Sequence, residues 1–428
     1  MSRASERGHG LLGLGLSLAV AASILGVGCG LGSSGGKTIV LHPEESDAAR
    51  ALWNVDFTVE FTIPENFRYR TEEYGSAAAD PARGLIYVGS RDGTLLAIDD
   101  VHGEFVWELD LGGGLSSPPV LAVVEEGADE SGHLHAHVAL PGDRPDWMLV
   151  GTDDGALVAL DLETREVRWR YRTSGLVRTP AVLGEAVVHF ANSRDEIITV
   201  DVRSGDWVWQ YSGEFQKDFT VFGRAGLAYL PPVEAAAGDV GQLFTGFADG
   251  RVVALDATSG EARWVQPLAP PDAKLFVDVD TTPVLVPERG ELIVANQTSG
   301  VYSLDLSDGA RRWNTEIRAV GSIVEGPGIY LAASSLEGLY GLEQDGRIRW
   351  REQLDPGAIA APLVIGDTVL VAHSDAGLLA YSADSGEMLL RFFNGSGSSG
   401  QPIYDPVLER VYASSDRGVL YALGLLPE

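Results

Sequence analysis

A short pattern of alternating apolar and polar residues recurs along the chain and ends in a tryptophan. It appears as GTLLAIDDVHGEFVW to Trp107, GALVALDLETREVRW to Trp169, EIITVDVRSGDWVW to Trp209 and GRVVALDATSGEARW to Trp264. Alternation with a period of two predicts a β-strand, and the polar stretch between the acidic residue and the tryptophan predicts a turn into a second strand. Each copy is therefore predicted to be a β-hairpin.

Weaker copies continue the series, so that eight can be aligned. They are GVYSLDLSDGARRW to Trp313, GLYGLEQDGRIRW to Trp350, GLLAYSADSGEMLL and GVLYALG. The acidic position falls at Asp99, Asp161, Asp201, Asp256, Asp305 and Glu343, and continues as Ser382 and Gly424. This spacing is close to the ~40–50 residues of a four-stranded propeller blade. A further hairpin, PAVLGEAVVHFANSRD at 180–195, completes the four strands, and we predict an all-β, eight-bladed β-propeller.

The eighth copy reaches the end of the sequence before its outer strand, so we expect another segment to complete that blade. LWNVDFTVEF, residues 52–61, alternates in the same way and precedes the first complete set of four strands. We predict that it closes the ring as the outer strand of blade eight and so removes an open edge. The repeated tryptophans are expected to be structural, each burying roughly 150–250 Å²; they are Trp53, Trp107, Trp169, Trp209, Trp264, Trp313 and Trp350.

The N-terminal region has the composition of an export signal. MSRASERGHG is followed by the apolar run LLGLGLSLAVAASILGVG and then by Cys29, the single cysteine of the chain. We predict a signal peptide over 1–28, a lipidated Cys29 with a flexible tether over 29–49, and the propeller over 50–428. Cys29 resembles the acylated cysteine of bacterial lipoproteins, although Gly26 stands where that motif usually has leucine. The alternative is a secreted protein with a free thiol. By the same resemblance, Gly30 directs the lipoprotein to the outer membrane.

Composition and charge narrow the possible partners. Apolar residues make up 45% of the chain and 52 residues are glycine, which is typical of a folded, turn-rich protein. The formal net charge is −30. This charge repels phosphate backbones, so nucleic acid is not expected as a partner.

An acidic insertion, residues 123–146, separates the first two copies and contains three histidines. His133, His135 and His137 would point to one side of an extended strand, where imidazoles can bind zinc or copper. The alternative is a solvated surface loop, and we predict no metal site. The chain has no P-loop, G-x-S-x-G or H-E-x-x-H motif. A pair of carboxylates acting on sugars would form only in the folded protein.

Repeats of the form A-L-D-x-x-(T/S)-G-x-x-x-W resemble the pyrroloquinoline-quinone-type β-propeller superfamily, over residues 52–424. That superfamily includes quinoprotein dehydrogenases, which typically carry a disulfide of adjacent cysteines and often a C-x-x-C-H haem motif. With one cysteine, this chain is expected to have no cofactor and not to be an enzyme.

LFVDVDTTPVLV at 275–286 is similar to the corresponding stretch of the BamB family, lipoproteins of the outer-membrane β-barrel assembly machinery. MLLRFFNGSGSSGQPIYDP and RVYASSDRGVLYAL resemble the last blades of that family. The resemblance implies a scaffold that binds the periplasmic domains of BamA, anchored by lipid on the periplasmic side of the outer membrane of a Gram-negative bacterium. The alternatives are a propeller that binds another envelope protein, and an enzyme acting on a quinone or a sugar.

Two segments at matching positions are the candidate partner-binding site. FQKDFTVFGRA, residues 215–225, follows the Trp209 strand, and residues 275–283 follow the Trp264 strand. Both connect the outer strand of one blade to the inner strand of the next, so we expect them side by side on one face. In the family these segments carry two apolar residues and an arginine, then two aspartates, that contact BamA. The matching residues here are Phe219, Val221, Phe222, Arg224, Asp278 and Asp280.

The position of the arginine differs from the family pattern. Phe222 stands where the family has arginine, and Arg224 follows two residues later. The alternative interpretation is that the two aspartates cap their loop by accepting backbone or threonine hydrogen bonds, while Phe219 and Val221 pack inward.

Overall fold

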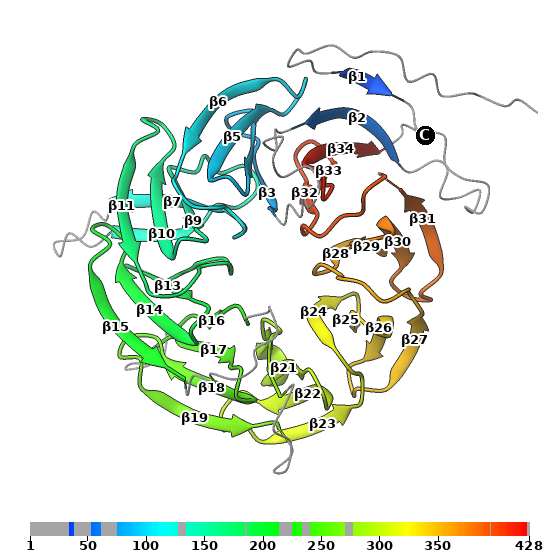
Figure 1. Ribbon diagram of the computed structural model, residues 1–428. Helices are drawn as coiled ribbons and strands as arrows, with labels where there is room; N and C mark the ends of the chain where they lie inside the picture. Colours follow the sequence, from blue (N-terminus) through cyan, green and yellow to red (C-terminus); the bar gives the residue numbers. More distant parts are fainter. Residues whose placement is uncertain are drawn as a thin grey trace, which may run out of the picture. The chain divides into compact units, whose positions relative to one another are not determined.

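The computed structural model contains a ring of β-sheets. It describes residues 34–37, 53–60, 75–126, 134–184, 186–213, 225–232, 240–269, 277–393 and 395–425. The strands of these residues form eight antiparallel sheets, which follow one another around a central axis (Figure 1). The ring belongs to one compact unit, Ser33–Glu428. The predicted eight-bladed β-propeller is confirmed.

The first four blades follow the order of the chain, from the axis outward. Blade one is β3 (Ala77–Asp80), β4 (Leu85–Gly89), β5 (Thr94–Asp99) and β6 (Phe105–Asp110). Blade two is β7 (Val120–Glu126), β9 (Trp147–Gly151), β10 (Ala156–Asp161) and β11 (Val167–Arg172), with β8 (Leu134–Val138) on the other side of β7. Blade three is β12 (Val182–Leu183), β13 (Val187–Ala191), β14 (Glu196–Asp201) and β15 (Trp207–Ser212). Blade four is β16 (Ala228–Leu230), β17 (Gln242–Gly246), β18 (Arg251–Asp256) and β19 (Ala262–Pro267).

The remaining blades repeat this arrangement. Blade five is β20 (Val284–Val286), β21 (Glu291–Asn296), β22 (Gly300–Asp305) and β23 (Arg311–Thr315), with the 3-10 helix η3 (Pro287–Arg289) between its first two strands. Blade six is β24 (Val320–Gly326), β25 (Ile329–Ser334), β26 (Gly338–Glu343) and β27 (Ile348–Glu352). Blade seven is β28 (Leu363–Ile365), β29 (Thr368–His373), β30 (Gly377–Ser382) and β31 (Met388–Phe392). Blade eight is β32 (Ile403–Asp405), β33 (Arg410–Ser414), β34 (Val419–Leu425) and β2 (Trp53–Glu60).

The N-terminal strand β2 closes the ring, as predicted. It pairs antiparallel with β34, from Trp53 opposite Leu425 to Glu60 opposite Val419. Val59 is buried in a cluster that also contains side chains of blades one and eight. A short strand from the predicted tether, β1 (Ser34–Lys37), pairs with the outer side of β2. Strands from both ends of the described chain therefore build blade eight.

The acidic position of each repeat organises the turn between the third and fourth strands. In blade two, Asp161 Oδ1 accepts hydrogen bonds from the backbone N–H groups of Glu163 and Thr164, at 3.0 and 2.7 Å. An aspartate that binds the backbone two and three residues later favours a tight turn over a continued strand. In blade five, hydrogen bonds from Ser307 and Arg312 lower the pKa of Asp305 to about 2.

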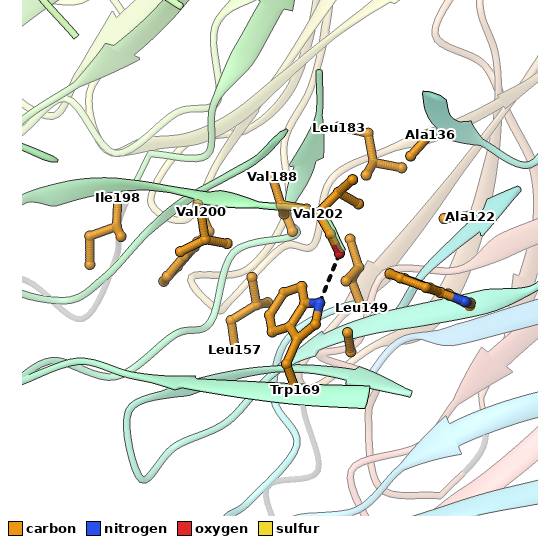
Figure 2. Packing of buried hydrophobic residues seen from close by; sticks show 14 of the residues in the cluster. Ala122, Ala136, Leu149, Leu157, Trp169, Leu183, Val188, Ile198, Val200 and Val202 are labelled. Atoms are coloured by element: carbon orange, nitrogen blue, oxygen red, sulfur yellow. Dashed lines mark hydrogen bonds between the residues drawn. The ribbon is translucent and has the colours of Figure 1, made fainter. Parts of the chain in front are cut away.

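Neighbouring blades pack through the repeated tryptophans. The indole Nε1–H of Trp169 donates a hydrogen bond to the carbonyl of Val202 in the next blade at 2.8 Å (Figure 2). Around it lies a buried cluster of side chains from blades two and three, including Leu157, Val188 and Val200. The core of the ring therefore consists of such layers between blades.

Two faces of the ring follow from this antiparallel order. Because successive strands reverse direction, the turn between the first and second strands and the turn between the third and fourth strands lie on one face, here called the turn face. The turns between second and third strands, and the linkers that join blades, lie on the opposite face, here called the linker face. In the part of the chain that the structure describes, no helix is long and apolar enough to cross a membrane.

Candidate partner-binding site

Residues 277–282 form the last part of the linker-face connection from β19 to β20, and backbone hydrogen bonds hold this segment between two blades. The N–H of Val279 donates to the carbonyl of Phe247 in blade four at 3.1 Å. The N–H of Gln297 in blade five donates to the carbonyl of Asp278 at 2.9 Å. The side-chain amide of Asn296 donates to the carbonyl of Val277. The segment is therefore a fixed part of the seam between these blades.

The two aspartates of this segment are buried. Asp278 is 3% exposed and Asp280 is 9% exposed. The amide Nε2 of Gln297 donates to Asp280 Oδ2 at 3.1 Å. Thr281, the next residue, accepts the N–H of Ala295 at 2.9 Å through its hydroxyl oxygen. The seam therefore encloses both carboxylates, and blade five holds Asp280 directly.

Asp278 differs from the residues that take its place in other linkers. In five of the other described linkers, the carbonyl of one residue likewise accepts an N–H from the next second-to-third-strand turn, at 2.7–3.0 Å. Those residues are Gly114, Leu176, Ala319, Ala358 and Gly397. All five are small or apolar, so among the six described linkers that make this contact, only the one between blades four and five has an acidic side chain at this position.

The structure brings the end of the other predicted segment against this linker. Phe219, Val221, Phe222 and Arg224 lie outside the described residues. Directly after them, the N–H of Gly226 donates to the hydroxyl of Thr282 at 3.0 Å. The carbonyl of Gly226 accepts the hydroxyl of Thr245 at 3.1 Å. Gly226, which directly follows the segment 215–225, therefore contacts the linker that carries the two aspartates.

The other candidate residues are placed only in part. Cys29 and His133 lie outside the described residues, and of His135 only the backbone position on β8 is described. His137 is exposed, with its Nε2 3.7 Å from Asp143 Oδ2. Within the described ranges, no three His, Cys, Asp or Glu side chains gather in the way that a metal ion requires.

A second feature lies on the turn face and was not predicted from the sequence. A pocket of about 610 Å³ is lined by Arg83, Val124, Arg144, Asp146, Trp147, Asp161, Glu163, Arg168 and Arg203. These residues come from blades one, two and three. One signal was present in the sequence: the insertion leads into β9 with GDRPDW, which places three charged residues directly before the tryptophan that begins this strand.

Comparisons with known proteins agree on one family. The family model for outer membrane protein assembly factor BamB matches residues 123–338 and 324–425. Outer membrane protein assembly factor BamB of Shewanella oneidensis is 22% identical over 349 residues, which cover 80% of this chain and 82% of that protein.

Solved structures share the fold. The crystal structure of BamB from Moraxella catarrhalis has a TM-score of 0.65 at 19% identity and covers 87% of this chain and 100% of that chain. A quinohemoprotein alcohol dehydrogenase from Pseudomonas putida HK5 has a TM-score of 0.62 at 13% identity, covering 90% of this chain and 78% of that chain. The propeller is therefore common to assembly factors and to enzymes.

Proposed function

This chain belongs to the family of the outer membrane protein assembly factor BamB, and from that premise we propose that it is a non-enzymatic scaffold that binds a BamA-like outer-membrane assembly protein. The binding site is the linker face at the seam between blades four and five. Binding there presents the partner's periplasmic domains to barrels that are being inserted. The ring supplies a rigid support, because each blade packs on the next through buried layers.

The observation that supports this site is the acidic linker itself. Asp278 stands where five other linkers carry small or apolar residues. Both acidic side chains are enclosed in the seam, and Gln297 holds Asp280 in a fixed position there. The neighbouring segment 215–225 supplies apolar side chains, Phe219 and Val221. An apolar anchor beside a fixed charge is typical of the residues that dominate protein–protein binding.

We place the protein at the outer membrane, on the periplasmic side. In this proposal the signal peptide is removed and Cys29 carries the lipid, so that the chain from residue 30 onward tethers the propeller to the membrane. Mass spectrometry of the mature N-terminus tests this step. A diacylglycerol-modified Cys29 is the expected result, and an unmodified cysteine would contradict it.

The partner site is tested by combining Phe219→Ala with Asp278→Ala. The double variant should lose co-purification of the BamA-like protein, because truncating such an anchor typically costs ~1–4 kcal/mol of binding free energy. The control is Asp375→Ala, an exposed carboxylate on the same face in blade seven. This control variant should recover as much of the BamA-like protein as the parent chain does. Undiminished recovery with a folded double variant would place the partner elsewhere on the ring.

A further inference from the structure

Blade two carries a β-hairpin that the regular four-stranded pattern does not require. Its first strand, β7, continues past the sheet and pairs with β8 on its free side. Ala122 is the branching point, since it lies opposite both Val138 of β8 and Trp147 of β9. Residues 139–146 then lead back to β9 over the turn face. The insertion therefore adds a wall to the turn face at blade two.

That wall completes the pocket of about 610 Å³. Arg83 comes from the turn after β3, while Arg144 and Trp147 come from the end of the insertion. Arg168 lies on β11, and Arg203 lies in the turn after β14. Four guanidinium groups thus gather in one pocket, together with the carboxyl groups of Asp146, Asp161 and Glu163.

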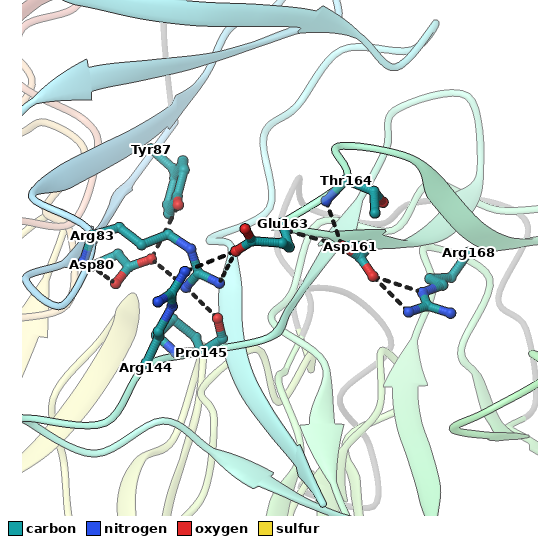
Figure 3. Close-up of polar contacts among 9 residues, drawn as sticks. All are labelled: Asp80, Arg83, Tyr87, Arg144, Pro145, Asp161, Glu163, Thr164 and Arg168. Carbon is teal, nitrogen blue, oxygen red and sulfur yellow. Dashed lines mark hydrogen bonds and ion pairs between the residues drawn. The ribbon is translucent and has the colours of Figure 1, made fainter.

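Glu163 lies between two of these arginines. Its Oε2 accepts a hydrogen bond from Arg144 Nη2 at 2.8 Å and lies 3.8 Å from Arg83 Nη2 (Figure 3). The Glu163 side chain is 72% exposed. The Arg144 side chain is 61% exposed, so its ion pair with Glu163 contributes only ~0–1 kcal/mol, whereas the Arg83 side chain is 10% exposed. A carboxylate from another molecule can therefore replace that of Glu163 at little cost.

Two of the four arginines, Arg83 and Arg168, are held in position. Arg83 donates to the buried carboxylate of Asp80 at 3.1 Å and to the carbonyl of Pro145. Arg168 donates to Asp161 Oδ2 through Nε and Nη2, at 3.0 and 2.6 Å, and its guanidinium lies 5.4 Å from the centre of the Trp147 ring. Arginines held in this way present their remaining N–H groups in a fixed geometry, which suits recognition of a carboxylate.

An apolar groove adjoins the pocket. It has a volume of about 170 Å³ and a mostly apolar lining that includes Leu140, Pro141, Tyr404 and Pro406, with three aspartates, Asp80, Asp143 and Asp405, also in the lining. Leu140 is 65% exposed. Pro145 also lines the groove, and its carbonyl accepts the hydrogen bond from Arg83, so the two cavities share a wall.

We propose that the pocket and groove together form a second docking site, which binds an extended segment of a partner protein with a carboxylate side chain beside apolar side chains. The carboxylate takes the place of Glu163 between Arg83 and Arg144, and the apolar side chains lie in the groove against Leu140. The position between Arg83 and Arg144 selects this occupant, since the carboxylate of Glu163 already occupies it and the two guanidinium groups disfavour a basic segment there. The site lies on the face opposite to the proposed partner site. One chain can therefore bind two partners at the same time.

The test uses a displayed library of random 12-residue peptides, panned on the purified full chain and counter-selected on Arg144→Glu. Arg144 is 61% exposed, so this variant should fold normally. We expect enrichment of peptides with Asp or Glu next to Leu, Ile, Phe or Pro. A selected peptide should bind Arg144→Glu and Leu140→Asp at least tenfold more weakly than the parent. The same loss of affinity for the parent chain is expected when the acidic residue of the peptide is replaced by Asn or Gln.

Three controls locate the effect. Arg347→Glu reverses an exposed charge on the turn face of blade six and should leave the affinity unchanged. The variant with Phe219→Ala and Asp278→Ala should also bind the peptide normally, which separates this proposal from the proposed function. Glu163→Gln should strengthen binding, because it removes the competing carboxylate.

Several outcomes would overturn the proposal. The first is a selection in which no peptide is enriched on the parent chain relative to Arg144→Glu. The second is enrichment of basic peptides, and the third is a selected peptide that binds the parent chain and Arg144→Glu with equal affinity. A fourth is complete release of the peptide by low millimolar inorganic phosphate, which would indicate a site for small anions only.

Discussion

The backbone of Gly260 lies so close to the indole ring of Trp209 that a Cβ atom on the glycine would lie 2.5 Å from Cε3 of the ring. Trp209 is on the outer strand of blade three, and Gly260 is in the turn before the outer strand of blade four. In that same turn, the carbonyl of Ala257 accepts the indole Nε1–H at 3.0 Å. Equivalent close approaches join Gly205 to Trp169, Gly309 to Trp264, Gly346 to Trp313 and Gly386 to Trp350. The glycine and the tryptophan of the repeat are thus two halves of one contact between blades.

Gly260→Ala should therefore destabilise the ring more than an ordinary glycine substitution. The new methyl group has to displace the ring of Trp209, and overpacking of this kind costs ~1–3 kcal/mol beyond the strain of a positive φ. Gly328→Ala is the matched control, because its φ of +70° is close to the +74° of Gly260 and nothing lies within 4 Å of the new atom. Urea denaturation measures both free energies of unfolding. Equal losses would show that the contact with Trp209 does not matter.

Strand β2 should determine the stability of the ring, and the residues before it should not. A chain that starts at residue 62 lacks β2, which exposes the edge of β34 and removes Val59 from its buried cluster. We expect its free energy of unfolding to fall by at least ~3 kcal/mol, the scale of losing one large core side chain. A chain that starts at residue 51 keeps β2 and should lose far less. Equal melting temperatures for the two chains would contradict this prediction.

His189 should make the protein less stable in acid. Burial lowers the pKa of His189 to about 3, and its Nδ1 lies 2.7 Å from the hydroxyl oxygen of Thr199. An unfolded histidine titrates near pH 6.5, so between pH 6.5 and pH 3 the unfolded chain binds the proton and the folded chain does not. Stability therefore falls as the pH falls through this window, by up to ~1.4 kcal/mol per pH unit.

The check is the change in melting temperature between pH 7 and pH 4.5 for the parent chain and for His189→Gln. Glutamine retains a hydrogen-bonding group for Thr199 and does not titrate. The variant should lose less stability on acidification than the parent. Parallel curves would show that other groups cause the acid sensitivity.

Thr282→Val should weaken the partner site without unfolding the ring. The substitution keeps the shape of the side chain and removes the acceptor for the N–H of Gly226, which releases the end of segment 215–225. One hydrogen bond contributes ~0.5–1.5 kcal/mol, so the melting temperature should change little while recovery of the BamA-like protein falls. Thr258→Val changes an exposed threonine on the opposite face and serves as the control. Equal recovery from both variants would disconnect Gly226 from partner binding.

The repeat predicted most of the fold because the same local pattern had to serve every blade. Alternation of apolar and polar residues predicted the strands, and the acidic position marked the turn between the third and fourth strands. The incomplete eighth copy predicted that an N-terminal strand, β2, completes the last blade. The burial of Asp278 could not be predicted in this way, since Gln297 and Phe247 enclose its linker from neighbouring blades. The arginine pocket was missed for the same reason. Arg83 and Arg203 come from different copies and meet only when the ring has formed.

The pairing of β2 with β34 also sets the order of events during biosynthesis. The ribosome makes β2 before any complete blade and makes β34 after all the others, so the strand has to remain without its partner while nearly the whole chain emerges. Contacts between such distant segments form late and slowly. Completion of the last blade therefore requires full-length synthesis: in a chain cut short before β34, strand β2 lacks its partner on the inner side, which leaves an edge that another strand can pair with.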